Sequence, residues 1–283
     1  MRLVSYRSGS GAAAGVLVDE RIVPLQALGA PAPGVRGLLA VLDATALAAL
    51  GERAAGAADA IALADVELLA PVPDPQKIIC MGLNYRDHAE ETGQEIPHAP
   101  MWFAKFANSL VGSGQAVILP RAHPDYVDYE AELAVVIGRT AQRVAVEDAL
   151  SHVAGAMPFN DVSARDLQFE NPLWASGKAI DTFAPCGPAL VTLDECGDLD
   201  ALGLRARIDG RVVQDGTTAN MIFSVAEMVA WLSRTITLEA GDIIATGTPA
   251  GVGAPQGIFL RDGDTVEVEV DGLGAVVSHV KAA

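Results

Sequence analysis

The sequence predicts a strand-rich α+β fold that carries a small N-terminal domain of strands and helices. Three observations support this fold class. Short apolar segments bounded by turn residues recur along the 283 residues, Ala- and Leu-rich helical patterns are concentrated in residues 36–63, and a proline-rich break separates the two parts. With 51% hydrophobic and 19% charged residues, the chain can form a sizeable core. Its length fits one large domain, or one domain with a smaller appendage.

The N-terminal part contains the expected strands at residues 2–6, 14–18 and 21–25, followed by helices within residues 36–63. Pro71, Pro73 and Pro75 then form a stiff connector that ends this periodicity. We therefore place a boundary near residue 72. This gives a small N-terminal domain at residues 1–71 and a larger second domain at residues 72–283.

Strands dominate the second part, and the clearest predictions are residues 77–81 and 116–119. Residues 204–213 alternate around Asp209-Gly210, which predicts a tight hairpin, and residues 265–270 before Asp271-Gly272 repeat this pattern. Helices are expected at residues 146–153 and 224–232. The second helix begins with Ser224 and has Glu227 three residues later, which is a capping box. This pattern leaves the strand topology open.

Composition excludes several function classes. A net charge of −17 disfavours binding to nucleic acid or to anionic lipid, since both need a basic surface. An anionic substrate would need local attraction from a metal or from a few buried cations. The three cysteines show no C-x-x-C spacing, which disfavours a disulfide framework or a zinc site. The start resembles no signal peptide, and no apolar run approaches the ~18 residues of a membrane span. We expect a soluble, cytoplasmic protein.

Two carboxylates, Glu130 and Glu132, lie one residue apart in a segment that otherwise has the pattern of a strand. Residues i and i+2 of a strand point to the same face. Because the following residues are hydrophobic, like charges converge where little water is expected. Asp161 ends another apolar run, and three carboxylates would form a hard oxygen site for Mg²⁺, Mn²⁺ or Ca²⁺. From spacing alone, the alternative is a solvated edge strand with Asp161 capping a turn.

Three further segments carry polar groups that could serve catalysis. His88 and Glu91 are neighbours on one face if residues after Gly82 form a short helix, and a carboxylate beside an imidazole suits a general base. Lys178 follows a small-residue turn and could bind a carboxylate or stabilise an enolate. Residues 243–253 form a strand leading into a Gly-rich turn that could bind an anion. The alternatives are an incidental surface histidine, an exposed lysine and a turn that uses Gly for positive φ.

Together and in this order, these segments resemble the fumarylacetoacetate hydrolase family over about residues 72–283. The resemblance rests on five motifs, which are Gly82-Leu83-Asn84-Tyr85-x-x-His88, Glu130-x-Glu132, Asp161-x-x-x-Arg165-Asp166-x-Gln168, Lys178, and Thr246-Gly247-Thr248-Pro249-x-Gly251-Val252-Gly253. One departure is Phe106, because many relatives carry proline after the residue that corresponds to Lys105.

The resemblance implies a mixed β-roll or sandwich-like fold and a homodimer. It implies that Glu130, Glu132 and Asp161 bind Mg²⁺ or Mn²⁺. It assigns His88 and Glu91 to a water-activating dyad on a lid over the substrate, and Lys178 to the stabilisation of substrate oxyanions. The substrate-binding residues that it implies are Tyr85, Arg165, Gln168 and Thr248, with Thr248 holding a carboxylate.

We interpret the chain as a metal-dependent hydrolase that cleaves a C–C bond in an acylpyruvate or related 2,4-dioxo acid, in the catabolism of aromatic or sugar acids. The expected partner is a small anionic keto acid. One alternative is an isomerase or decarboxylase acting on 2-hydroxyhepta-2,4-diene-1,7-dioate or oxaloacetate-type acids, which needs no attacking water. A second alternative is a non-catalytic binding protein on the same fold.

Overall fold

Two large open sheets form most of the computed structural model, which describes residues 1–9 and 11–283. Within these residues the larger sheet has eleven strands in the order β4-β3-β2-β1-β15-β12-β11-β18-β6-β7, with β5 paired to β1. Its strands are β1 (Arg2–Ser8), β2 (Gly11–Val18), β3 (Arg21–Pro24), β4 (Ile61–Ala62), β5 (Leu68–Leu69), β6 (Ile78–Gly82), β7 (Met101–Lys105), β11 (Ala131–Ile137), β12 (Val153–Asn160), β15 (Leu190–Thr192) and β18 (Ile243–Ala245).

The second sheet has the order β17-β16-β19-β20-β9, and two short pairs, β10 with β13 and β14 with β8, complete the strands. The bounds are β8 (Leu110–Val111), β9 (Ala116–Leu119), β10 (Val127–Asp128), β13 (Ser163–Ala164), β14 (Ala184–Pro185), β16 (Gly203–Ile208), β17 (Arg211–Thr217), β19 (Thr265–Val270) and β20 (Gly274–Ala282). The helices are α1 (Val35–Val41), α2 (Ala44–Ala55), α3 (Arg86–Glu91), α4 (Val146–Ala149), α5 (Arg165–Phe169), α6 (Ala175–Lys178), α7 (Val225–Ser233) and α8 (Gly253–Gln256).

The core explains the apolar run that follows Glu132. Leu133 and Val135 of β11 pack in one buried cluster with residues of β16, β19 and β20, so the two sheets lie face to face. Ala134 and Val136 point the other way, into a second cluster shared with α1 and α2. Both faces of β11 are therefore buried, and a strand of this kind is apolar at every position rather than at alternate ones.

Most predicted elements are confirmed. The strand-rich α+β class is correct, and the sandwich-like packing of two sheets agrees with the expected architecture. Asp209 and Gly210 form the predicted hairpin turn with positive φ angles of 49° and 79°. Ser224 and Glu227 make both hydrogen bonds of the capping box at the start of α7.

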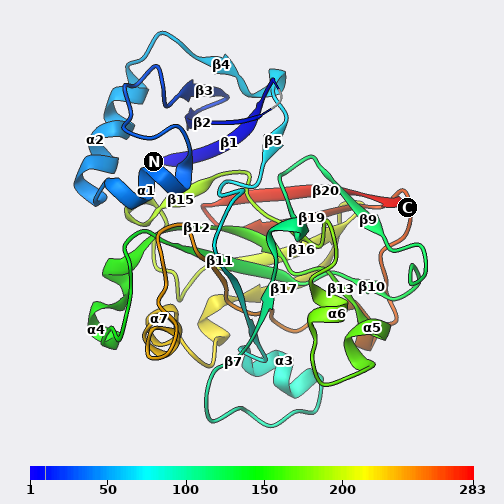
Figure 1. The fold of residues 1–283 in the computed structure, drawn as a ribbon. Coiled ribbons are helices and arrows are strands. Elements are labelled where there is room, and N and C mark those ends of the chain that lie inside the picture. The colour runs from blue at the N-terminus through cyan, green and yellow to red at the C-terminus, as the bar shows by residue number, and fades with distance from the viewer. Residues whose placement is uncertain (10) are drawn as a thin grey trace.

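The N-terminal segment lies at one end of the molecule, shown in blue in Figure 1. Its strand β1 pairs with β15, so the large sheet continues across the connector at residues 71–75. The boundary near residue 72 stays a prediction. Within the described residues, no helix is long and apolar enough to span a membrane.

Candidate metal centre

Strand pairing brings the three predicted acidic ligands together. Glu130 and Glu132 flank Ala131 at the start of β11, which runs antiparallel to β12 with Ala131 opposite Asn160. Asp161 follows the end of β12, and its backbone N–H donates to the carbonyl oxygen of Glu130 at 3.0 Å. One carboxylate oxygen from each acid lies within 4.8 Å of the others. The side chains thus form a compact cluster at the end of two neighbouring strands.

Glu132 is the least satisfied of the three acids. Its side chain is fully buried, and its Oε2 accepts a hydrogen bond from the N–H of Gly247 at 3.0 Å. Among the residues that the structure describes, no group donates a hydrogen bond to its Oε1. Burial raises the pKa of Glu132 well above its usual range, and the charges of Asp161 and Glu130 raise it further. This carboxyl therefore either keeps a proton or requires another cation.

Glu130 is in the opposite electrostatic situation. Although burial raises its pKa, Lys178 and Arg165 lower it to about 2. Lys178 Nζ lies 2.8 Å from Glu130 Oε2 and 3.0 Å from Asp161 Oδ2, so its ammonium group bridges the two acids. Burial lowers the pKa of Lys178, but Asp161 and Glu130 outweigh this effect and raise it. Lys178 is therefore held as a cation.

The donor set fits Mg²⁺ or Mn²⁺. Both ions prefer oxygen ligands, and three carboxylates within 4.8 Å supply them without cysteine or histidine. The unpartnered Oε1 of Glu132 is the observation that favours an ion, because a buried carboxylate oxygen without a donor is costly. Glu130, Glu132 and Asp161 would hold the ion.

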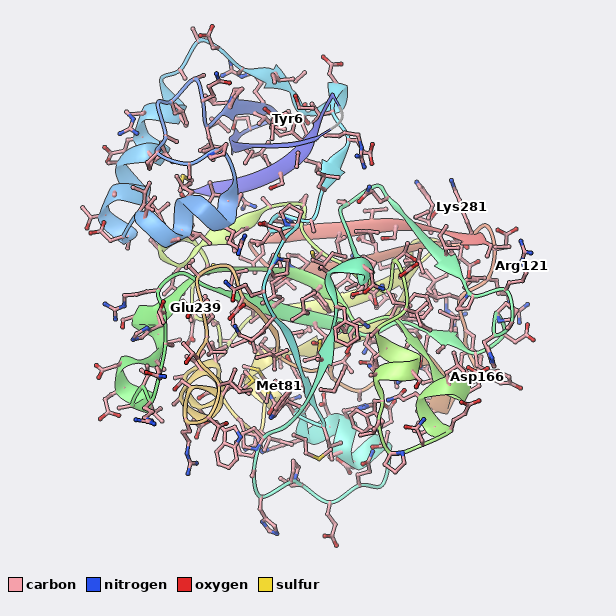
Figure 2. The ribbon with its side chains drawn as sticks, viewed as in Figure 1. Tyr6, Met81, Arg121, Asp166, Glu239 and Lys281 are labelled. Carbon is pink, nitrogen blue, oxygen red and sulfur yellow. The ribbon has the colours of Figure 1, made fainter. Side chains whose placement is uncertain are left out.

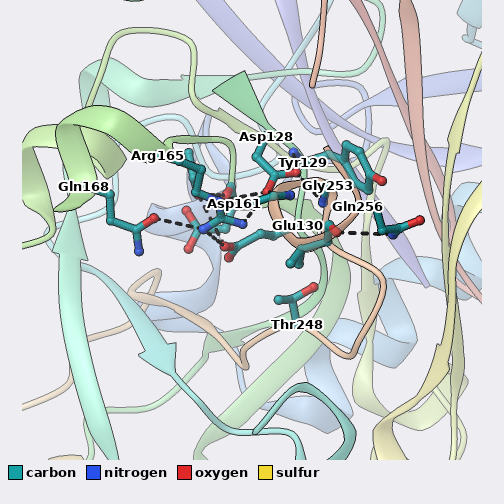
Figure 3. Close-up of polar contacts among 12 residues, drawn as sticks. Asp128, Tyr129, Glu130, Asp161, Arg165, Gln168, Thr248, Gly253 and Gln256 are labelled. Carbon is teal, nitrogen blue, oxygen red and sulfur yellow. Dashed lines mark hydrogen bonds and ion pairs between the residues drawn. The ribbon is translucent and has the colours of Figure 1, made fainter. Parts of the chain in front are cut away.

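Arg165 is held by acids, but its Nη2, 2.7 Å from Asp128 Oδ2, makes no hydrogen bond with the residues that the structure describes. Its Nε donates to Asp128 Oδ2 at 2.8 Å, and its Nη1 lies 2.7 Å from Glu130 Oε1 and donates to Gln168 Oε1 at 2.9 Å. Asp128 also accepts the backbone N–H groups of Gly253 and Ala254 at the start of α8, at 2.7 and 2.9 Å. Figure 3 shows this chain of contacts from Gln168 through Arg165 to Asp128 and Glu130.

The sequence analysis assigned no role to two buried charged residues of this cluster. Asp128 is fully buried beside the E-x-E pair, and its position two residues before Glu130 was an available signal. Lys105 is 1% exposed, contacts Asp161 Oδ1 and donates to the carbonyl oxygen of Val162 at 3.0 Å. Its sequence neighbours gave only the weak signal of a lysine at the end of an apolar strand.

His88 and Glu91 lie on α3, directly after β6. His88 Nδ1 is 3.2 Å from Glu91 Oε2, and Glu91 Oε1 accepts the N–H of Gly251 at 2.9 Å. The predicted pair is therefore in contact, and Glu91 also ties α3 to the Gly-rich loop. Because Nδ1 faces the carboxylate, Nε2 is the ring nitrogen left for chemistry.

A cavity of about 200 Å³ connects these groups. His88, Glu130, Glu132, Arg165, Gln168, Lys178 and Thr248 contribute polar side chains to its lining. Figure 2 labels Met81, which also lines the cavity and lies near α3. It also labels Asp166, which is on α5 together with Arg165 and Gln168. The predicted catalytic residues His88 and Lys178 therefore line the same cavity as Glu130 and Glu132 of the acidic cluster.

Two predicted substrate-binding residues, Tyr85 and Thr248, have less to offer a substrate than the other predicted site residues. Tyr85 is fully buried and is not among the residues that line the cavity, and burial raises the pKa of its hydroxyl. Thr248 lines the cavity, but its hydroxyl donates to the carbonyl oxygen of Ala131 at 2.9 Å and accepts from Gln214 Nε2 at 2.9 Å. With its hydrogen committed to the backbone, this hydroxyl can offer a substrate only an acceptor. The substrate roles of Tyr85 and Thr248 stay predictions.

Comparison with known proteins gives a consistent family match. Residues 77–281 match the family model described as fumarylacetoacetate (FAA) hydrolase C-terminal. The human mitochondrial oxaloacetate tautomerase FAHD2A is 44% identical over 220 residues, which are 76% of this chain and 70% of that protein.

Two solved structures extend the match over the whole fold. The 5-carboxymethyl-2-hydroxymuconate delta-isomerase from Mycobacterium smegmatis has 32% identity and a TM-score of 0.79, covering 100% of this chain and 99% of that chain. The maleylpyruvate hydrolase from Sphingobium sp. SYK-6, in complex with manganese(II) and pyruvate, has 31% identity and a TM-score of 0.84, covering 100% of both chains.

Proposed function

The chain belongs to the fumarylacetoacetate hydrolase family, and we propose that it is a divalent-metal-dependent isomerase that interconverts the keto and enol forms of oxaloacetate-type 2-oxo acids. Members of this family are enzymes. The proposal replaces C–C hydrolysis as the leading interpretation, because the 44% identical human relative is named an oxaloacetate tautomerase and a structural neighbour is named an isomerase. The observation that carries it is the buried three-carboxylate cluster beside Lys178.

A bound Mg²⁺ or Mn²⁺ supplies Lewis acidity and a template for a chelating 2-oxo acid. The protein groups around it fit enolisation, in which a proton leaves C3 and negative charge forms on the oxygen at C2. In the tautomer in which His88 Nδ1–H donates a hydrogen bond to Glu91, the Nε2 lone pair is available to take the C3 proton. The Lys178 ammonium stabilises the charge that forms on the oxygen, because its own paired acids keep it protonated.

The test is the decay of enol-oxaloacetate, followed by its ultraviolet absorbance with and without Mg²⁺ or Mn²⁺. We expect metal-dependent acceleration over the uncatalysed rate, with the keto form as the product. Coupled detection of pyruvate in the same samples measures decarboxylation separately. A rate that equals the uncatalysed rate at every metal concentration would contradict the proposal and favour a non-catalytic binding protein.

Hydrolysis of acylpyruvates is the second candidate. It is favoured by the contact between His88 and Glu91, because a histidine oriented by a carboxylate can also deprotonate water. The match to a maleylpyruvate hydrolase supports it as well. Product analysis with acetylpyruvate distinguishes the two reactions, since hydrolysis releases pyruvate and acetate whereas isomerisation releases neither.

A further inference from the structure

The Gly-rich loop at residues 246–254 donates backbone hydrogen bonds to carboxylates of the protein itself. The sequence predicted that this loop could bind an anion, and four of its N–H groups do meet an anionic oxygen. At 2.7–3.0 Å, these contacts are Gly247 N to Glu132 Oε2, Gly251 N to Glu91 Oε1, Gly253 N to Asp128 Oδ1 and Ala254 N to Asp128 Oδ2. Glu132 belongs to the acidic cluster, and Glu91 contacts His88. Of the three acids, Asp128 alone has no part in the proposed reaction, so its burial needs another explanation.

Asp128 is fully buried, and both of its carboxylate oxygens accept several hydrogen bonds. Besides the two loop N–H groups, its Oδ1 accepts the N–H of Tyr129 at 2.8 Å and its Oδ2 accepts Arg165 Nε at 2.8 Å. Asp128 does not line the cavity, and it is not one of the three acids that could hold an ion. With its oxygens committed, this carboxylate can influence a ligand only through the groups that it holds.

Arg165 is the side chain through which Asp128 reaches the cavity. The short strands β10 and β13 pair with Asp128 opposite Ser163, which brings Asp128 beside Arg165 at the start of α5 (Figure 3). Arg165 lines the cavity, and its guanidinium is held at Nε by Asp128 and at Nη1 by Glu130 and Gln168. Because Glu130 would also hold a metal ion, Asp128 is the anionic partner of Arg165 that has no other role in the site.

We propose that Asp128 is a positioning residue that fixes the Arg165 guanidinium for the binding of an anionic 2-oxo acid. Asp128 and Glu130 balance the charge of Arg165, so Arg165 does not act as a free cation. What it offers a ligand is N–H donors in a fixed direction, and its Nη2 makes no hydrogen bond with the residues that the structure describes. A planar guanidinium that is already held at Nε and Nη1 loses little freedom when it donates to a ligand. This inference rests on the proposed function only in its choice of ligand.

The experiment measures the affinity for oxalate at saturating Mg²⁺ by calorimetry. Oxalate offers a carboxylate next to a second oxygen donor, as a 2-oxo acid does, but it has no C3 and cannot enolise. Asp128→Asn keeps the shape of the side chain and should weaken oxalate binding about tenfold, as expected when a charged hydrogen bond to a ligand is lost. Asp242→Asn is the matched control, because Asp242 is also fully buried, accepts two backbone N–H groups and contacts Lys77, but lies outside the cavity lining. Both variants should lower the Tm in EDTA, and only Asp128→Asn should weaken oxalate binding.

A double-mutant cycle with Arg165→Met tests whether Asp128 acts through Arg165. If it does, adding Asp128→Asn to Arg165→Met should weaken oxalate binding no further, whereas independent roles would give losses that multiply. Arg165→Lys is a second variant, which keeps a cation beside the buried carboxylate. Because lysine is a point charge without the planar fork of arginine, Arg165→Lys should also weaken oxalate binding about tenfold.

Kinetics and binding separate this inference from the proposed function. If oxaloacetate is isomerised, Asp128→Asn should raise KM more than it lowers kcat. Four results would overturn the positioning role and leave the isomerase proposal standing: native oxalate affinity in Asp128→Asn or Arg165→Lys, losses that multiply in the double variant, an equal loss in Asp242→Asn, or no oxalate binding by the native protein. If oxaloacetate is not isomerised, the isomerase proposal fails, and the oxalate cycle alone decides the role of Asp128.

Discussion

Replacing Glu132 by glutamine should make the metal-free protein more stable. Glutamine keeps the shape and can still accept the N–H of Gly247, while its amide group replaces the unpartnered Oε1. Two unit charges 4.8 Å apart, the limit for these ligand oxygens, repel by about 3.5 kcal/mol at an effective dielectric near 20. Nearby cations and proton uptake by Glu132, whose pKa is raised, offset most of this repulsion, so we expect a net gain of about 1 kcal/mol, or roughly 2–4 °C in Tm.

The same substitution should remove most of the stabilisation by metal. An ion present at 100 times its Kd stabilises the folded state by about 2.7 kcal/mol, which corresponds to roughly 5–11 °C in Tm. Loss of one of three anionic ligands should weaken binding about 100-fold, which leaves about 0.4 kcal/mol at the same concentration. The order of stability should therefore reverse, with Glu132→Gln more stable in EDTA and the native protein more stable in Mg²⁺.

Thermal unfolding followed by circular dichroism, in EDTA and in a Mg²⁺ series, measures both effects. Calorimetric titration gives the affinity directly. Glu147→Gln is the matched control, because Glu147 is exposed on α4 and belongs neither to the acidic cluster nor to the cavity lining. An unchanged Mg²⁺ shift in Glu132→Gln would refute the reasoning, since it would mean that the ion is bound elsewhere.

Three further outcomes test two other residues of the site and one buried thiol of the core. His88→Asn should lower kcat for isomerisation at least about 100-fold while the Mg²⁺-induced Tm shift stays intact, and a variant with native kcat would exclude His88 as the base. Lys178→Met should lower kcat more than it raises KM, whereas a change in KM alone would mean that Lys178 only binds the substrate in the ground state. The same substitution should lower the Tm in EDTA, because it removes the partner of two buried carboxylates. Burial raises the pKa of the Cys196 thiol to about 11. Because only the thiolate reacts, the modification rate of Cys196 in the native protein should rise about tenfold per pH unit between pH 7 and 9. A plateau of this rate near pH 9 would contradict the raised pKa.

Local chemistry made part of the structure predictable. Asp209-Gly210 predicts the hairpin turn because both residues tolerate positive φ, and both adopt it. Ser224 and Glu227 predict the start of α7 because their side chains satisfy the N–H groups at that helix end. These signals involve residues within a few positions of each other, so no knowledge of the topology was needed.

The acidic cluster depended on long-range pairing that the sequence pattern left open. Glu130 and Asp161 meet because β11 and β12 pair in one register, and a shift by one residue would turn Glu132 to the other face. Spacing left a metal site and a solvated edge strand as alternatives for these acids, and it was the resemblance to a known family that favoured the metal site. Lys105 is a clearer example of a contact that local sequence patterns cannot predict. It reaches Asp161 across 56 residues, from β7 at the edge of the large sheet, and no local pattern indicates such a contact.

The buried cations bear on how the site attracts an anion. The sequence analysis expected a metal or a few buried Lys and Arg side chains to draw an anionic substrate into a chain with a net charge of −17. Lys105, Arg165 and Lys178 are indeed buried, but each is paired with an acid. Four carboxylates, those of Asp128, Glu130, Glu132 and Asp161, face these three cations when all are ionised. A divalent ion would leave one excess positive charge, which favours the entry of an anionic substrate. The charge balance of the buried cluster therefore links the attraction of an anionic substrate to the bound metal rather than to free cationic side chains.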